Sequence, residues 1–142
     1  MFTVDNQIQS SSFNLGSWPL SEVFLKNDRN YPWFILVPRV LEVQELWQLE
    51  KQDRQLLMEE INQLSILVNN QFNPDKLNVG ALGNIVKQLH IHVVARKASD
   101  ALWPHGIWQS ALINDPYREQ GLEEFLQGLR AQIVSRVFEI QQ

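Results

Sequence analysis

The sequence contains no cysteine, so it can form neither a disulfide nor a thiolate metal site. No apolar run approaches the roughly 20 residues that a membrane-spanning helix requires. Residues 1–5 have neither the basic region nor the apolar stretch of a signal peptide. The net charge of -4 gives no basic field for a nucleic acid polymer or an anionic membrane. These absences predict a cytoplasmic protein that binds neither a nucleic acid polymer nor a membrane.

Hydrophobic residues make up 44% of the 142 positions, which is ordinary for a globular protein. A chain of this length typically buries roughly 68–70% of its unfolded surface, enough for a hydrophobic core. We therefore predict one domain over residues 1–142.

Histidine is scarce, with three in the chain, and two of the three stand close together. Between Lys87 and Arg96, apolar side chains alternate with Gln88, His90 and His92, which is the two-residue period of a β-strand. One face of this strand is aliphatic. The other face sets the three polar side chains in a row, about 6.5 to 7 Å apart for each step of two residues. A rigid strand is suited to hold a reactive imidazole in a useful geometry.

The remaining patterns predict three more strands and two helices. The strands lie at residues 22–26, 33–37 and 76–79, and the helices lie at residues 50–71 and after the N-cap candidate Asp115. Residues 1–17 are mixed in composition and predict a loosely docked lead-in, anchored by the apolar residues Phe2, Val4, Ile8, Phe13 and Leu15. Because hairpins join neighbouring strands, we predict the α+β class. Its antiparallel sheet would consist of two hairpins, with a long central helix and a C-terminal helix.

Two loops carry candidate binding residues. Gly80 and Gly83 bracket a short connection into the histidine strand, and glycine lets a backbone N–H approach a bound anion closely. Asp28 lies in the turn of the first hairpin, whose length leaves room for a functional side chain.

Residues 88–94, Gln-Leu-His-Ile-His-Val-Val, resemble the His-φ-His-φ-His-φ-φ motif of the histidine triad (HIT) family, with Gln88 in place of the first histidine. Residues 78–80, Asn-Val-Gly, resemble the family's Asn-x-Gly, and residues 83–84 occupy the place of its Gly-Gln. Residues 33–39 are similar to the family's second strand, with Trp33 where a histidine usually stands. The resemblance covers residues 20–97 and leaves a C-terminal segment and helix over the rest. With the later Trp-Pro-x-x-x-Trp segment, the chain is similar to a bacterial subgroup of HIT-like hydrolases.

The resemblance implies a nucleotide phosphohydrolase or nucleotidyl transferase that acts at the α-phosphate of a dinucleoside polyphosphate or nucleoside phosphoramidate. It implies that His90 is the nucleophile and forms a covalent nucleotidyl intermediate, and that His92 donates to a phosphate oxygen or the leaving group. Imidazole suits this role because its ordinary pKa near 6.5 leaves a neutral nitrogen available at neutral pH. The implied binding residues are Asn78, Gly83 and Asn84 for the phosphate and Asp28 for the ribose hydroxyls. The scheme needs no cofactor and no metal, and the family implies a homodimer.

Other interpretations stay open. Gln88 and Trp33 replace two family histidines, which is compatible with a nucleotide-binding module or sensor that has lost turnover. Gln88 can still donate and accept, so it could orient the nucleophile. A zinc site in which His105 or Asp100 joins the two strand histidines would instead make a metal-dependent hydrolase.

Four residues outside the motif have simpler interpretations. Trp103 and Trp108 are predicted to serve packing or a dimer interface rather than to stack a base. Arg39 and Arg96 are predicted to be surface residues.

Overall fold

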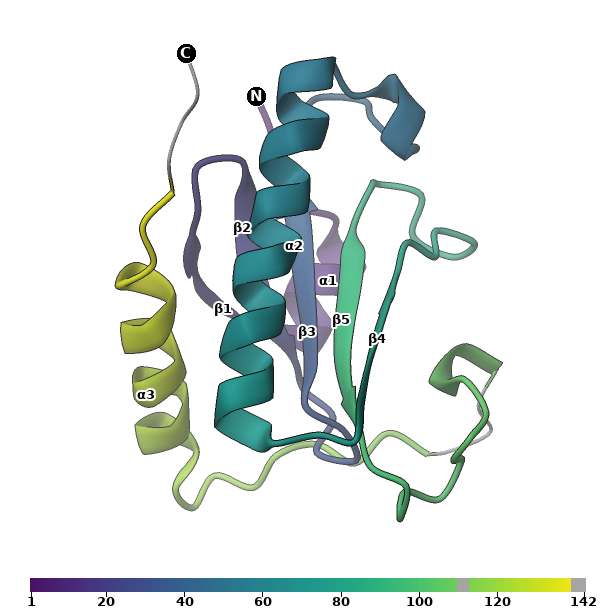
Figure 1. Cartoon of the computed structure of the whole chain (residues 1–142), viewed down its shortest axis with the longest axis vertical. Helices are drawn as coiled ribbons and strands as arrows, with labels where there is room; N and C mark the ends of the chain where they lie inside the picture. Colours follow the sequence, from purple (N-terminus) through teal and green to yellow (C-terminus); the bar gives the residue numbers. More distant parts are fainter. Residues whose placement is uncertain (110–112, 139–142) are drawn as a thin grey trace.

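The computed structural model describes residues 1–109 and 113–138, which are built on a five-stranded antiparallel sheet (Figure 1). The elements in chain order are α1 (Asn6–Ser11), β1 (Ser12–Ser17), β2 (Ser21–Lys26), β3 (Trp33–Pro38), the 3-10 helix η1 (Leu46–Gln48), α2 (Lys51–Phe72), β4 (Lys76–Gly80), β5 (Ile91–Arg96), the 3-10 helix η2 (Ile107–Gln109) and α3 (Leu122–Val134). The strands lie in the order β1-β2-β3-β5-β4. Every neighbouring pair is antiparallel, which confirms the predicted α+β class.

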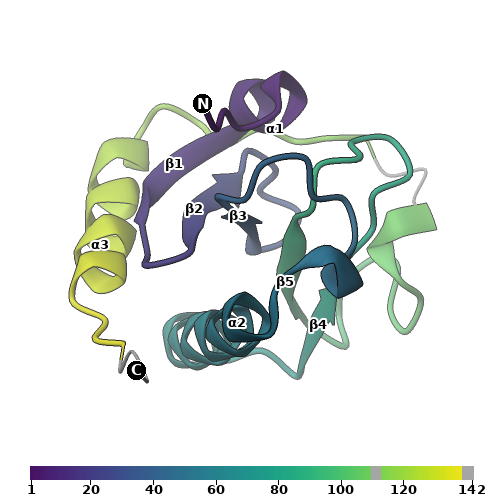
Figure 2. The same cartoon turned by 90° about the horizontal axis from the view of Figure 1, so that it is seen from above.

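The two faces of the sheet are covered by different elements. Figure 2 shows α2 on one side and α1 on the other, with α3 beside β1 at the edge. The main core lies on the α2 side of the sheet, where alternate strand residues pack against α2 and α3. Its members include Val23, Leu25, Phe34, Leu36, Ile91 and Val93 from the strands, Leu57, Leu64 and Leu67 from α2, and Leu126, Leu129 and Ile133 from α3. In both helices the buried positions recur at helical spacing.

The long helix α2 matches the predicted helix within one residue at each end. Its buried leucines recur at helical spacing, and burying each one stabilises the fold by roughly 1.5–3 kcal/mol relative to exposure. The helix ends at Phe72, and the next residue, Asn73, has a left-handed φ of 47° and donates its N–H to the carbonyl of Asn69. Asparagine adopts this conformation more readily than most residues, which explains the stop. No helix in the described part of the chain is long and apolar enough to cross a membrane.

Residues 1–17 are not the loosely docked lead-in that their composition predicted. Asp5 caps α1 by accepting the N–H of Gln7 at 2.8 Å. The six residues after α1 form the edge strand β1, which pairs with β2. Val4 and Ile8 pack on the second face of the sheet against apolar residues of β2 and β3, which confirms them as anchors. The sheet therefore has five strands rather than four, because long-range pairing orders a polar stretch with little strand propensity of its own.

The last helix begins at Leu122 and not directly after Asp115, so the predicted N-cap is wrong. The residue at the cap is Gly121, with a φ of 76° that favours glycine. The Oδ2 of Asp115 instead accepts the Nε of Arg29 at 2.6 Å. This ion pair ties the segment before α3 to the turn between β2 and β3.

Candidate active site

The two neighbouring histidines lie where the connection of residues 81–90 enters β5. Strand pairing of β5 begins at Ile91, so Gln88 and His90 precede the strand and its predicted start at Lys87 is wrong. The predicted hairpin of β4 and β5 is confirmed, but its connection is longer than the short turn expected.

His90 has a defined tautomer. Its side chain is 6% exposed, and its Nδ1 lies 2.7 Å from the main-chain oxygen of Gln88. A carbonyl oxygen can only accept, so Nδ1 carries the proton and donates. In the neutral ring, Nε2 then holds the free lone pair. This is the state that a nucleophilic imidazole requires.

His92 packs beside the first ring, with a distance of 4.8 Å between the centroids of His90 and His92. The Nε1–H of Trp33 donates to Nδ1 of His92 at 2.9 Å. An indole N–H can only donate, so the proton of the neutral His92 ring is on Nε2. Trp33 therefore fixes in His92 the opposite tautomer from that in His90.

The environment of His92 also fixes its charge. Burial, followed by the nearby charges of His90 and Lys26, lowers the pKa of His92 to about 3, against the opposing effect of a backbone hydrogen bond with Leu82. The ring is neutral at physiological pH. It can offer a hydrogen bond, but it supplies no imidazolium proton to a leaving group.

The free energy of unfolding should fall in acid because of His92. The ordinary pKa near 6.5 applies to the unfolded chain, and the folded value is about 3, so the unfolded state binds the extra proton between them. Stability contributed by the neutral ring is complete above about pH 6.5 and is lost as the pH falls, by up to about 1.4 kcal/mol per pH unit. Urea unfolding of the wild type and His92→Asn between about pH 7 and pH 5 measures this slope. The variant should have the shallower slope, and equal slopes would contradict the assignment.

An aromatic cluster surrounds His92. The ring centroid of Trp108 lies 5.1 Å from that of His92 and 6.0 Å from that of Trp33, which confirms the packing role predicted for Trp108. Nζ of Lys26 lies 4.8 Å from the centroid of Trp33. Burial lowers the pKa of Lys26, while the charge of Asp28 opposes this shift. Sequence reasoning missed Lys26, because its place on the histidine face follows only from the register of β2, β3 and β5.

A hollow of about 210 Å³ lies beside His90. Gly83 and Asn84, two of the predicted phosphate residues, line it together with Lys87. Gln44 and Glu45 line it from the segment before η1. The structure therefore brings His90, Gly83 and Asn84 together, and it adds a cation that the sequence analysis did not single out.

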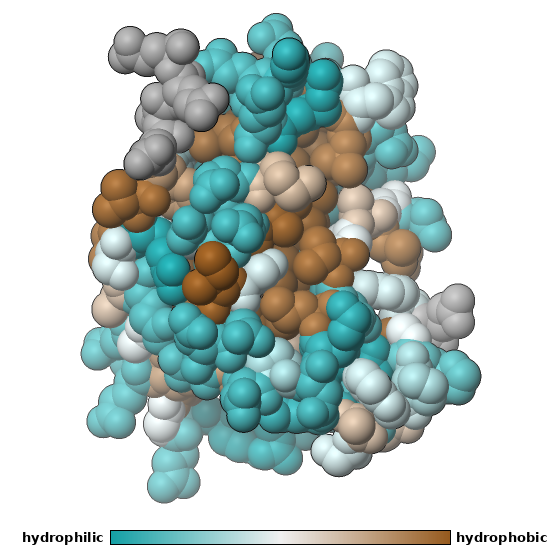
Figure 3. Space-filling view, in the orientation of Figure 1, coloured by the Kyte–Doolittle hydropathy of each residue, from teal (hydrophilic) through white to brown (hydrophobic). Residues whose placement is uncertain are grey.

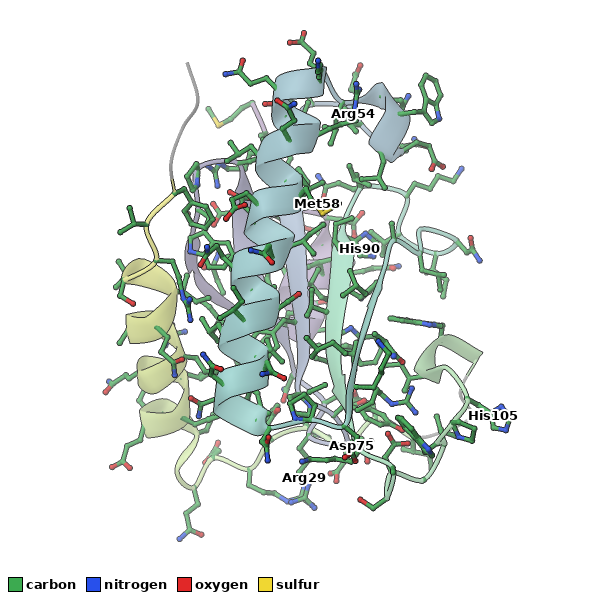
Figure 4. The ribbon with its side chains drawn as sticks, viewed as in Figure 1. Arg29, Arg54, Met58, Asp75, His90 and His105 are labelled. Carbon is green, nitrogen blue, oxygen red and sulfur yellow. The ribbon has the colours of Figure 1, made fainter. Side chains whose placement is uncertain are left out.

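Asp28 lies at the other end of the sheet from the hollow. Its Oδ1 accepts the N–H and the Nδ2 of Asn30 at 3.0 and 2.8 Å, and its side chain is buried. Figure 4 shows its neighbour Arg29 at the lower end of the sheet and His90 near the upper end of β5. The carboxylate organises the turn between β2 and β3, as aspartate commonly does, and is not placed with the histidines.

Asn78 is held by Arg96, which is 1% exposed and not the surface residue predicted. Nη1 of Arg96 donates to Oδ1 of Asn78 at 2.9 Å, and Nε and Nη2 donate to Asp100 at 2.7 and 3.0 Å. Its guanidinium carbon lies 5.4 Å from the ring centroid of Tyr31 and 5.8 Å from that of Trp103. The hydrogen bonds between Arg96 and Asp100 raise the pKa of Arg96 and lower the pKa of Asp100. This network joins β4 to β5 and leaves the amide nitrogen of Asn78 as its available donor.

The residues considered for zinc do not converge. Asp100 is engaged by Arg96, and Figure 4 shows His105 on an outer loop away from His90. Within residues 1–109 and 113–138, no group of three or more His, Cys, Asp or Glu side chains is arranged to hold a metal ion.

The chain belongs to the histidine triad family, because the model of the HIT domain matches residues 7–99. A histidine triad protein of Marinobacter aquaeolei VT8 is 34% identical, with a TM-score of 0.90 over 96% of this chain and 99% of that one. A histidine triad protein of Bradyrhizobium japonicum is 34% identical, with a TM-score of 0.87 over 93% of this chain and 98% of that one. No curated protein matches the chain. Proteins of this family bind nucleotides and include hydrolases and transferases.

Proposed function

We propose that the chain is a nucleotide phosphohydrolase or nucleotidyl transferase that forms a covalent nucleotidyl intermediate on His90. The observation that carries the proposal is the geometry of this ring. Its Nδ1–H is bonded to the carbonyl of Gln88, so the lone pair of the neutral ring is on Nε2, and the residue lines a hollow together with Gly83, Asn84 and Lys87.

In the first step, the Nε2 lone pair of His90 forms a bond to the α-phosphorus of the nucleotide conjugate. The bond from phosphorus to the leaving group breaks, and its electron pair leaves with that group. The ring becomes positively charged, and the Gln88 carbonyl that accepts the Nδ1–H stabilises this charge. The hydrogen bond is already formed in the resting protein, so it costs no reorganisation during the reaction.

In the second step, water attacks the phosphorus and the bond to Nε2 breaks, which releases nucleoside monophosphate and restores the neutral ring. The water proton passes to solvent. A different acceptor in place of water would make the same site a transferase. Lys87 offers a positive charge, and the backbone near Gly83 offers neutral donors, to the phosphoryl oxygens during both displacements.

Binding without turnover is the second candidate, and two observations favour it. The neutral state of His92 removes a source of protons for a poor leaving group, and Trp33 occupies its Nδ1. A site of this kind would hold a nucleotide without completing the first step.

Measurements of turnover and binding together separate the two candidates. The protein is incubated with a dinucleoside polyphosphate and with a nucleoside phosphoramidate, and release of nucleoside monophosphate is followed by chromatography. Binding of AMP is measured by calorimetry. We expect release from at least one conjugate. AMP binding with no release from either conjugate would contradict the hydrolase and support the binding module.

A homodimer in the cytoplasm stays a prediction, and two surface features support the pairing of two copies. Among the described strands, β4 pairs only with β5, so its other edge is open. Figure 3 shows apolar side chains gathered beside α2 on the side of β4. Exposed apolar residues of these two elements include Met58, Ile66 and Val79.

A further inference from the structure

The side chain of Gln88 is bonded to the N-terminal segment. Its Oε1 accepts the N–H of Asp5 at 2.8 Å, and its Nε2 donates to the main-chain oxygen of Thr3 at 2.9 Å. One primary amide thus both accepts from and donates to the same stretch of backbone. This segment is itself anchored, because Val4 and Ile8 are buried against the sheet.

The main chain of the same residue holds the nucleophile. The carbonyl of Gln88 accepts Nδ1–H of His90, and the N–H of Leu89, on the same planar peptide unit, donates to the carbonyl of Val43 at 3.0 Å. Gln88 precedes the first paired residue of β5, so hydrogen bonds between strands do not fix the Cα of Gln88. The two side-chain bonds to the N-terminal segment hold this Cα, while the bond to Val43 and the buried side chain of Leu89 hold the other end of the peptide unit.

The structure assigns Gln88 a positioning role: by clamping Thr3 and Asp5, it holds the carbonyl that keeps His90 in the tautomer protonated at Nδ1. The catalytic consequence of this clamp rests on the proposed function. The tautomer is a property of the resting protein and can be measured without substrate. The replacement of the first triad histidine therefore links the N-terminal segment to the nucleophile.

The backbone donor in the clamp can be removed alone. Asp5 has a φ of -53°, near the value of about -65° that proline fixes. Asp5→Pro therefore deletes the N–H that Gln88 accepts and requires little change in φ. Asp5→Ala is the matched control, since it also loses the carboxylate that caps Gln7 but keeps the N–H.

The ¹⁵N chemical shifts of the His90 ring report its tautomer. We expect Nδ1 protonation in the wild type and in Asp5→Ala, and a mixture of both tautomers in Asp5→Pro and Gln88→Ala. In turnover assays, the two clamp variants should lose about 10- to 100-fold in kcat, the range typical of residues that orient a reacting group. In Asp5→Pro, KM should change little, because every residue lining the hollow remains.

Gln88→Glu adds a test that a merely structural role would not pass. Its ionised carboxylate accepts from Asp5 but repels the carbonyl of Thr3, whereas the protonated form can donate to that carbonyl. At neutral pH, where the new carboxyl group is ionised, Gln88→Glu should therefore show a mixture of both His90 tautomers, as Gln88→Ala does, although its side chain has nearly the shape of glutamine. An unchanged single tautomer in Asp5→Pro and Gln88→Ala would overturn the positioning role. Absence of turnover in the wild type would contradict the proposed function and would leave the tautomer measurement decisive for the clamp.

Discussion

His90→Asn is expected to abolish release of nucleoside monophosphate, with kcat reduced on the order of 10⁴-fold or more, as for other enzymes that lose their nucleophile. The asparagine Nδ2 can still donate to the carbonyl of Gln88, so local structure is preserved. No nitrogen remains at the place of Nε2, so the covalent step is lost. Steady-state hydrolysis of the best conjugate measures the effect.

The matched control is His105→Asn, which makes the same exchange on an exposed outer loop. Its kcat should equal that of the wild type. AMP affinity of His90→Asn should remain close to the wild-type value, which shows that the site is intact. Turnover in His90→Asn within tenfold of the wild type would exclude this residue as the nucleophile.

Arg96→Met is expected to lower the free energy of unfolding by about 3–5 kcal/mol, because removal of one partner leaves a buried charge unpaired. The Asp100 side chain is 10% exposed and receives two hydrogen bonds from the guanidinium. The substitution also frees Oδ1 of Asn78, so three hydrogen bonds are lost in all, one of them between β5 and β4. Urea unfolding at neutral pH measures the loss.

Arg118→Met is the control for this loss. Arg118 also pairs with an aspartate, at 3.3 Å from Asp115, but its side chain is 61% exposed. An exposed pair contributes about 0–1 kcal/mol, so this variant should unfold almost as the wild type does. Similar losses in the two variants would show that burial of Arg96 does not decide its contribution.

The sequence predicted the elements that carry strong local patterns. The hairpin of β2 and β3, the helix α2 and the strand β4 lie where alternation or helical spacing placed them. The pairing of His90 with Gly83 and Asn84 was also predicted, because all three lie close together in the sequence and feed into one strand.

The remaining features depend on contacts between distant segments. Strand β1 has only two apolar residues, Phe13 and Leu15, which are too few for a clear strand pattern, and its pairing with β2 reveals it. Arg96 resembles a surface cation in the sequence, but it is buried because Asp100 and Asn78 together satisfy its donors. Gln88 lines the hollow with His90, as its place in the motif indicated. Its side chain is bonded to Asp5, 83 residues earlier in the chain, and no local pattern indicates this partner.

The account depends most on the covalent bond between Nε2 of His90 and the α-phosphorus. The direct measurement is rapid quenching of the protein during turnover, followed by peptide mass spectrometry in neutral or alkaline buffer, where a phosphorus–nitrogen bond survives. The account predicts an added nucleoside monophosphate group on the peptide that contains His90, and no such group in His90→Asn. Turnover with no adduct, or with an adduct on another residue, would contradict it.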